Sequence, residues 1–381
     1  MCTAVFRKNI SNGQKISLWI ICTRSSLKLV VPMQFWNSPE FDDHEQVCCF
    51  SDAGSGLRAI VAIHSTALGP AAGGTRFMAY PDEQRALEDA LRLSRAMSYK
   101  SALAGLPCGG GKAVIIGDPE RIKSADLLHA YGRYLNRIGA VFVTGEDVGM
   151  AVRDMETIRA VCPYVGGTSS AGAGDPSVHT ATGLMHGLRA VLKWRFRGAS
   201  FSDLRVAIQG LGAVGWHVVE RLHAQGAQLT VSDIRPERVE RAVALFGARA
   251  AHPDEVHRSE VDIYCPCALG GVITEESAGQ IQARAVAGAA NNQLASPAAG
   301  QALAARGILY APDYVINAGG IISGLEEFLK MPGRSGRVDA PLSVRLERIH
   351  DRLLEIFDRA ARAQERPEVV AEQFARELIK R

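Results

Sequence analysis

The segment 210–215, Gly-Leu-Gly-Ala-Val-Gly, constrains the fold of this chain more than any other feature. It follows the apolar run 206–209, which is typical of a buried strand, and it precedes a helical pattern at 216–225. A second predicted strand ends in Asp233. These features together predict a βαβ unit that binds a dinucleotide. They are a strand, a turn with glycines at its first, third and sixth positions, a helix, and a second strand that ends in an acid.

Each residue of this unit has an expected task. Gly210 permits the tight turn, Gly212 lets the backbone approach a pyrophosphate, and Gly215 lets the helix pack on the strand. The N-terminus of the helix then faces the phosphates. A carboxylate at Asp233 accepts hydrogen bonds from the ribose hydroxyls and repels a 2′-phosphate, which favours NAD over NADP. Arg235 lies close by and leaves NADP open as an alternative.

The second half of the chain alternates predicted strands with predicted helices, a pattern that indicates a parallel sheet covered by helices. A length of 381 residues favours two domains. We expect an α/β protein with an N-terminal α/β substrate and oligomerisation domain (33–168), a Rossmann-type domain (169–335), and C-terminal helices (336–381) that pack back on the first domain. The segment 169–176 is rich in small and turn residues, so we predict an interdomain hinge there.

Residues 1–32 carry five basic residues and no acid. Such a leader fits an organelle transit peptide, whereas a signal peptide would need a longer apolar core and a cleavage site. The favoured interpretation is a non-native or over-extended start, with the folded protein beginning near Met33.

Composition narrows the functional classes. The formal charge of +3 and the scattered basic residues argue against a nucleic-acid or membrane partner. No apolar run approaches the length that spans a bilayer. The eight cysteines include no C-x-x-C pair, so we expect no metal site and interpret them as buried thiols in a reducing cytoplasm.

A second chemical signal lies in the first half. Lys112 follows three glycines at 109–111, which we interpret as a turn before a strand at 113–117; Lys100 precedes them, and Asp147 follows a predicted strand at 141–144. The glycines do not form a nucleotide P-loop, because that motif needs glycine at position 106 and Ser or Thr at 113. Two lysines and an aspartate on loops can hold a carboxylate, depress an amine pKa and move protons.

With these motifs in place, the chain resembles the Glu/Leu/Phe/Val dehydrogenase superfamily, and within it the leucine, phenylalanine and valine dehydrogenases. The resemblance covers roughly residues 33 to 381. The matching segments are 68–76 (LGPAAGGTR), 96–100 (AMSYK), 109–119 (GGGKAVIIGDP), 144–149 (TGEDVG), 210–215 (GLGAVG), 267–271 (CALGG), 290–294 (ANNQL) and 311–320 (APDYVINAGG).

The resemblance implies roles for individual residues and an active site in the cleft between the domains. Lys112 looks like the lysine that activates water, Asp147 like the aspartate that shuttles protons, and Lys100 like the lysine that binds the substrate α-carboxylate. The other implied substrate contacts are Gly73, Gly74, Asn317, Gly145 and Gly324. The implied NAD contacts are Gly210, Gly212, Ala213, Val214, Gly215, Asp233, Ala268 and Asn292.

The implied reaction is NAD-dependent oxidative deamination of an apolar L-amino acid to the 2-oxo acid and ammonia, and its reverse. A lysine must be neutral at some stage to act as the base, and burial together with the neighbouring Lys100 would depress the pKa of Lys112. Glutamate-specific relatives carry a lysine where this chain has Ala72. Gly145 and Gly324 are small, so we expect a roomy pocket that accepts phenylalanine or tryptophan as well as leucine.

Two other interpretations remain. A non-enzymatic NAD-binding regulator on the same fold would need none of Lys100, Lys112 and Asp147. A different oxidoreductase on a Rossmann scaffold would not depend on ammonia in the reverse direction. The resemblance also implies a cytoplasmic homo-oligomer of unspecified size and closure of the two domains around the substrate.

Overall fold

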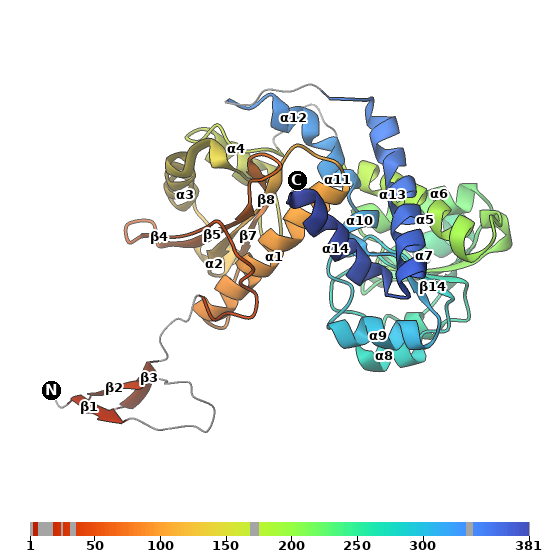
Figure 1. Ribbon diagram of the computed structural model, residues 1–381, viewed down its shortest axis with the longest axis horizontal. Helices are drawn as coiled ribbons and strands as arrows, with labels where there is room; N and C mark the ends of the chain where they lie inside the picture. Colours follow the sequence, from red (N-terminus) through yellow and green to blue (C-terminus); the bar gives the residue numbers. More distant parts are fainter. Residues whose placement is uncertain are drawn as a thin grey trace.

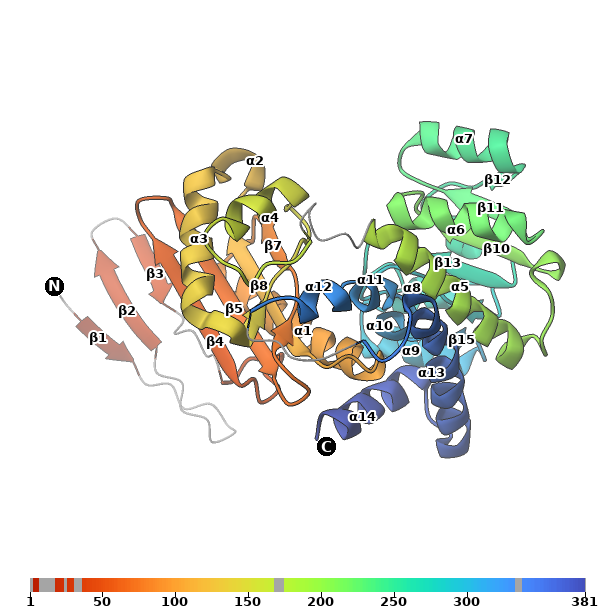
Figure 2. The same cartoon turned by 90° about the horizontal axis from the view of Figure 1, so that it is seen from above.

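The computed structural model describes residues 3–6, 18–23, 26–30, 36–167, 175–332 and 338–380. Two six-stranded sheets lie toward opposite ends of the molecule, each covered by helices (Figures 1 and 2). A small antiparallel sheet of β1 (Thr3–Phe6), β2 (Leu18–Thr23) and β3 (Ser26–Val30) lies apart from both. The predicted hinge at 169–176 lies outside the described residues, apart from its last two positions.

The first sheet is mixed and has the order β4-β5-β8-β6-β9, with β7 also paired to β8. Its strands are β4 (Gln46–Asp52), β5 (Leu57–Ser65), β6 (Ala71–Ala72), β7 (Thr75–Met78), β8 (Gly109–Ile116) and β9 (Phe142–Val143). Helix α1 (Glu83–Leu103) covers one face, while α3 (Ala125–Ile138) and α4 (Val152–Arg159) cover the other; α2 (Pro119–Ile122) follows β8.

Residues of β5 alternate between these two helical layers. Ile60 and Ala62 pack with α1, whereas Val61 and Ile63 pack with α3. Because both faces are buried, the strand is an unbroken apolar run instead of an alternating one. The same packing buries the full length of β8.

The glycines at 109–111 form the first part of β8, so the prediction of a turn was wrong. A Cβ at Gly109 would overlap the Ser65 carbonyl, and one at Gly110 would overlap the Ser98 backbone nitrogen. At Gly111, a Cβ would lie 2.7 Å from the Phe142 ring. Glycine is therefore required here for close packing of the strand against its neighbours.

The second sheet is entirely parallel and has the order β12-β11-β10-β13-β14-β15. Numbered from its first strand this is 3-2-1-4-5-6, the doubly wound arrangement that binds dinucleotides, and it confirms the predicted fold class. The strands are β10 (Arg205–Gln209), β11 (Gln228–Ser232), β12 (Arg249–Ala250), β13 (Ile263–Pro266), β14 (Ala285–Val286) and β15 (Leu309–Tyr310). The accompanying helices are α6 (Ala213–Ala224), α7 (Pro236–Phe246), α8 (Glu275–Gln280) and α9 (Pro297–Ala305).

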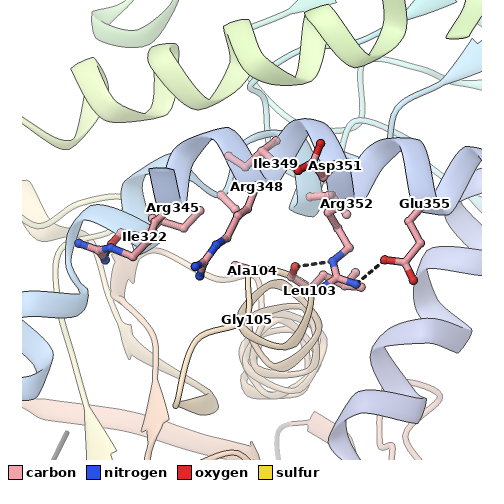
Figure 3. Close-up of a pocket in the computed structure, with 12 residues that line it drawn as sticks. Leu103, Ala104, Gly105, Ile322, Arg345, Arg348, Ile349, Asp351, Arg352 and Glu355 are labelled. Carbon is pink, nitrogen blue, oxygen red and sulfur yellow. Dashed lines mark hydrogen bonds and ion pairs between the residues drawn. The ribbon is translucent and has the colours of Figure 1, made fainter. Parts of the chain in front are cut away.

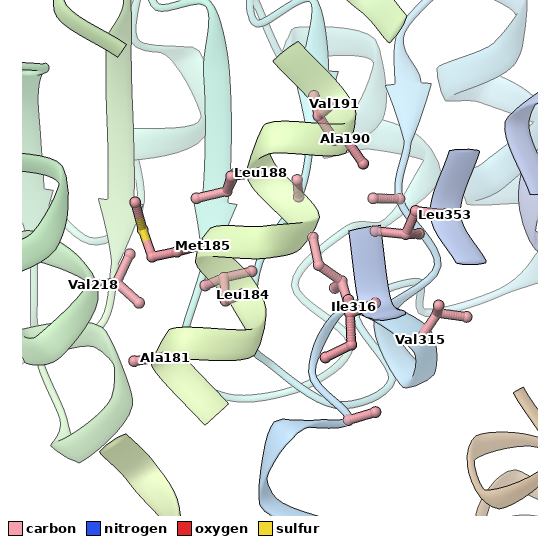
Figure 4. Packing of buried hydrophobic residues seen from close by; sticks show 14 of the residues in the cluster. Ala181, Leu184, Met185, Leu188, Ala190, Val191, Val218, Val315, Ile316 and Leu353 are labelled. Carbon is pink, nitrogen blue, oxygen red and sulfur yellow. The ribbon is translucent and has the colours of Figure 1, made fainter. Parts of the chain in front are cut away.

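Helix α5 (Pro176–Arg195) lies in the centre of the largest core cluster (Figure 4). Leu184 and Leu188 point from it into apolar surroundings that include Val218 on α6 and Ile316. The short helices α10 (Asp313–Ile316), α11 (Gly319–Ser323) and α12 (Leu325–Leu329) lie between the two sheets (Figure 2). They therefore carry residues toward the space that separates the sheets.

The predicted C-terminal helical stretch is divided into α13 (Leu342–Ala363) and α14 (Pro367–Ile379). The break occurs because Gln364 adopts a left-handed conformation with φ of 52°, and Pro367 begins the next helix. Helix α13 packs along α5, whereas α14 lies against α1, where Arg376 Nη2 donates to Asp42 Oδ2 at 2.8 Å. In the part of the chain that the structure describes, no helix is both long and apolar enough to cross a membrane.

Candidate active site

Lys112, from a strand of the first sheet, and Asp147, from the loop that follows β9, meet directly. Lys112 lies on β8 and is 6% exposed. Its Nζ donates to Asp147 Oδ2, and Asp147 Oδ1 accepts from the Val148 backbone N–H at 2.6 Å. The carboxylate is thus held both by its own loop and by the lysine.

Burial and nearby positive charges disfavour the ammonium form of Lys112, whereas its contact with the Asp147 carboxylate favours that form. Burial, then repulsion from Arg76 and Lys100, lower its pKa from 10.5 to about 7, against an opposing attraction from Asp89. Neutral lysine is then a substantial species near neutral pH, as proton transfer requires.

Arg76 also belongs to this cluster, and no role was predicted for it from the sequence. Its Nη1 donates to Asp89 Oδ2 at 2.8 Å, and its Nη2 lies 3.6 Å from Asp147 Oδ1. The side chain therefore joins α1 to the Asp147 loop and places a fixed positive charge beside Lys112. Its position at the end of the segment 68–76 was the available sequence signal.

Lys100 reaches across to the second sheet. Its Nζ donates to Asn291 Oδ1 at 3.3 Å, and Asn317 Nδ2 donates to the same oxygen at 2.8 Å. Burial lowers the pKa of Lys100 to about 8, partly opposed by Asp313. An acceptor oxygen thus sits between a lysine and an amide donor, an environment that also suits a carboxylate oxygen.

Asn291, for which the sequence predicted no role, makes these contacts, whereas Asn292 is the residue predicted to contact the cofactor. Asn292 has a φ of 51° and lines a different cavity beside Tyr99 and Asp313. The sequence shows two consecutive asparagines and does not indicate which of their side chains turns toward Lys100.

The predicted glycines line a cavity of about 250 Å³ next to the Lys112 cluster. Gly73 and Gly74 are hemmed in, since a Cβ on either would overlap or crowd the backbone of Gly111 or Glu146. Gly145 and Gly324 are open, because an added Cβ would meet no neighbouring atom closer than 3.7 Å. The cavity also includes apolar side chains from both sides of the cleft: Met97, Leu106, Val143, Ile321, Leu325, Phe328 and Met331.

The dinucleotide turn has the geometry that such a ligand needs. Gly210 has a φ of 99°, and a Cβ there would be 2.7 Å from that of Ala268. A Cβ on Gly212, by contrast, would meet nothing within 4 Å, so the backbone there is open to an approaching ligand. Helix α6 begins at Ala213, followed by Val214, and no side chain among the described residues caps it. Its first N–H groups are therefore available to a phosphate.

Asp233 lies at the end of β11, beside this turn. Its Oδ2 accepts from the Leu211 N–H at 2.7 Å, and Arg238 Nη1 lies 3.4 Å away. The Arg235 backbone N–H donates to Oδ1 at 2.9 Å, and Ile234 is 84% exposed next to it. The carboxylate is therefore fixed in place, and the turn, the uncapped helix and the acid together fit a dinucleotide.

A separate cavity of about 230 Å³ lies where the end of α1 meets α13 (Figure 3). Arg352 Nε donates to the Leu103 carbonyl at 3.0 Å, and its Nη1 donates to Glu355. Arg345 is similarly engaged with the Ile322 carbonyl at 2.8 Å. These arginines neutralise helix-terminal carbonyls and so have a structural explanation. Within the described ranges, no group of three or more His, Cys, Asp or Glu side chains could hold a metal.

Comparison with known proteins agrees with this geometry. Residues 44–164 match the Glu/Leu/Phe/Val dehydrogenase dimerisation domain, and residues 235–375 match the Glutamate/Leucine/Phenylalanine/Valine dehydrogenase domain. The chain is 44% identical to leucine dehydrogenase of Geobacillus stearothermophilus over 91% of this chain and 94% of that protein. It is 45% identical to valine dehydrogenase of Streptomyces albus, over 88% and 92%.

Among solved structures, L-tryptophan dehydrogenase from Nostoc punctiforme superposes with a TM-score of 0.76 at 41% identity, covering 88% of this chain and 96% of that one. The chain belongs to the Glu/Leu/Phe/Val dehydrogenase family and is an amino-acid dehydrogenase.

Proposed function

We propose that this enzyme catalyses the NAD-dependent oxidative deamination of an apolar L-amino acid to the 2-oxo acid and ammonia, and the reverse reductive amination. The observation that carries the proposal is the buried contact between Lys112 and Asp147 next to an apolar cavity. A non-enzymatic regulator would have no need to bury a lysine and hold its pKa near 7.

Substrate binding begins with the α-carboxylate. Lys100 and Asn317 already share one acceptor, the amide oxygen of Asn291, and a substrate carboxylate oxygen would take that place. Two charged or amide donors from opposite sides of the cleft fix the orientation of Cα. Before substrate binds, Asn291 orients the two donors, a role that the sequence did not suggest.

Lys112 and Asp147 carry out the proton transfers. A dinucleotide bound at the turn 210–215 would accept the hydride from Cα. Neutral Lys112 takes a proton from the water that adds to the resulting imine, and Asp147 exchanges protons with the departing nitrogen. The positive charge of Arg76 helps to lower the pKa of Lys112. The neutral lysine is therefore the reactive form in deamination.

For the cofactor, NAD is the proposed dinucleotide. Asp233 is held by two backbone N–H groups at 2.7 and 2.9 Å, so it presents a fixed carboxylate where a ribose would lie. A 2′-phosphate would be repelled there. The exposed Ile234 offers an apolar surface for an adenine ring.

For the substrate, we propose a large apolar side chain. Gly145 and Gly324 leave room where a methyl group would fit without steric overlap, and Ala72 lines the same cavity without a charge. The other side chains that line the cavity are largely apolar, and the carboxylates of Glu146 and Glu327, which also line it, would repel a second carboxylate on the substrate. The resemblance to an enzyme named for tryptophan supports this preference.

We further propose domains at 33–168 and 169–335, with 336–381 as C-terminal helices, and a homo-oligomer built through the first domain, as the match to a dimerisation domain suggests. The exposed edge of β4 is available to a second copy. Six free cysteines among the described residues suit a reducing, cytoplasmic location.

A panel of L-amino acids, each assayed with NAD and with NADP, tests the proposal. We expect turnover with leucine, phenylalanine and tryptophan, little with glutamate, and higher kcat/KM with NAD. A leucine-to-phenylalanine ratio in kcat/KM well above ~10 would contradict the roomy pocket. Absence of turnover with every amino acid would contradict the proposed function itself.

A further inference from the structure

Two thiols face each other next to the dinucleotide turn at 210–215. Cys265 lies on β13, and Cys267 follows one residue after the strand ends. Residues two apart in an extended chain point to the same side, and here the two Sγ atoms are 3.6 Å apart. Cys265 is buried, whereas Cys267 is partly exposed. An oxidant in solution can therefore reach one member of the pair.

The segment 265–267, Cys-Pro-Cys, makes backbone hydrogen bonds on both of its sides. On one side, the Cys267 N–H donates to the Gln209 carbonyl at 2.7 Å, and a Cβ on Gly215 would lie 3.3 Å from that of Cys267. On the other side, the Ala290 N–H donates to the Pro266 carbonyl at 2.9 Å. The segment therefore contacts both the cofactor turn and Ala290, the residue that directly precedes Asn291.

We propose that Cys265 and Cys267 form a reversible disulfide when the enzyme meets a peroxide, and that this disulfide weakens dinucleotide binding. The proposal concerns a modification site and rests on the proposed cofactor site only for its effect on binding. The disulfide itself can be detected without any assay of activity.

The chemistry balances with hydrogen peroxide as the oxidant. The Cys267 thiolate attacks one peroxide oxygen, which breaks the O–O bond and gives a sulfenic acid and hydroxide. The Cys265 thiol then attacks the sulfenic sulfur; the S–S bond forms and the oxygen leaves as water. In total, two thiols are oxidised by two electrons and one peroxide is reduced to two waters.

The environments of the two sulfurs indicate which thiol reacts first with the peroxide. A hydrogen bond from Cys265 and the Ala289 backbone N–H lower the pKa of Cys267 despite its burial. The same hydrogen bond to Cys267, together with burial, raises the pKa of Cys265. Cys267 is therefore the thiol that reacts first, and Cys265 retains the proton until it resolves the sulfenic acid.

Disulfide formation must move the backbone. The sulfurs have to approach from 3.6 Å to a bond of about 2.05 Å. Two residues of an extended strand span about 6.7 Å, at the upper end of the Cα separations of about 4.4–6.8 Å that a disulfide accepts. The end of β13 therefore contracts, and the tightly packed turn at Gly210 and Gly215 shifts with it.

Peptide mass spectrometry tests the modification directly. Trypsin releases residues 259–284, in which Cys265 and Cys267 are the only cysteines. After treatment with hydrogen peroxide and alkylation, we expect this peptide to carry no alkyl group and to be lighter by two hydrogens than the reduced peptide. Dithiothreitol should restore double alkylation, and prior saturation with NAD should slow the oxidation. Full alkylation after peroxide would overturn the proposal.

NAD titration, followed by protein fluorescence, tests the consequence. We expect the oxidised enzyme to bind NAD at least roughly tenfold more weakly, because the turn loses its backbone contacts to the pyrophosphate. Cys267→Ala, which removes the attacking thiolate, should show no loss of NAD affinity that dithiothreitol reverses, whereas Cys49→Ser, which removes an exposed thiol elsewhere, should behave as wild type. A disulfide with unchanged NAD affinity would refute the coupling. Failure of the reduced enzyme to bind NAD would instead count against the proposed cofactor.

Discussion

Replacing Arg76 by Gln should move the acidic limb of the pH profile for deamination to higher pH. Arg76 lowers the pKa of Lys112, and the neutral lysine is the base. Kcat/KM for the amino acid should therefore fall below pH 7 in the wild type, where Lys112 becomes protonated. Without Arg76 the ammonium form is more stable, so the lysine protonates at a higher pH.

The size of the effect follows from the geometry. Arg76 Nη2 lies 3.6 Å from one oxygen of Asp147, whose other oxygen contacts Lys112, so the two positive charges are roughly 6 Å apart. Their repulsion is then about 0.7 kcal/mol in water and about 2.8 kcal/mol at an effective dielectric constant of about 20. These bounds correspond to about 0.5 to 2 pH units, since one unit is about 1.4 kcal/mol. Arg76 is also one of three partners of Asp89 among the described residues, and its loss there acts in the same direction.

The assay is the initial rate of NADH formation at limiting amino acid from about pH 5.5 to 10. Arg76→Lys is the matched control, because it keeps the charge and should leave the limb within about 0.3 pH units of wild type. An unmoved limb in Arg76→Gln would refute the assignment of Lys112 as the titrating base. Equal shifts of the acidic limb in Arg76→Gln and Arg76→Lys would show that the geometry of the Arg76 side chain, and not its charge, sets the pH profile.

Three further predictions follow from the site. Lys112→Met should lower kcat roughly a thousandfold while NADH binding, measured by fluorescence, stays unchanged; full activity would contradict the mechanism. Gly145→Ala and Gly324→Ala should raise the leucine-to-phenylalanine ratio of kcat/KM roughly tenfold each, because the methyl groups occupy the cavity; Gly279→Ala, which meets open space on α8, is the control. Asp233→Asn should narrow the preference for NAD over NADP by roughly tenfold, since it removes the repulsion of the 2′-phosphate; an unchanged ratio of kcat/KM would point to other determinants.

Local signals were sufficient to predict the second sheet. The glycines, the strand pattern and Asp233 lie within one short segment, and each has a local physical reason, so a parallel sheet that binds a dinucleotide could be inferred, although the order of its strands was not predicted. The position of Lys112 beside Asp147 required the family resemblance, because the two residues are brought together by pairings between distant segments. Strand β6 pairs with both β8 and β9, and Thr75 pairs with both Ala113 and Glu146.

Other features depend on contacts between distant parts of the chain. The glycines at 109–111 look like a turn in sequence, but they are needed because β5, α1 and Phe142 approach the strand closely. Arg76 and Asn291 act through partners far away in the chain, and nothing local distinguishes Asn291 from Asn292. The break at Gln364 is similarly hidden, although Pro367 marks the start of the next helix.

The most direct test of the account is the ammonia dependence of the reverse reaction. The enzyme is mixed with NADH and the 2-oxo acid of leucine or phenylalanine, with and without ammonium, and NADH oxidation is followed together with the product. We predict oxidation only with ammonium and one amino acid formed per NADH consumed, because Lys112 and Asp147 handle the protons of an imine. Ammonium-independent oxidation to a 2-hydroxy acid would contradict that assignment.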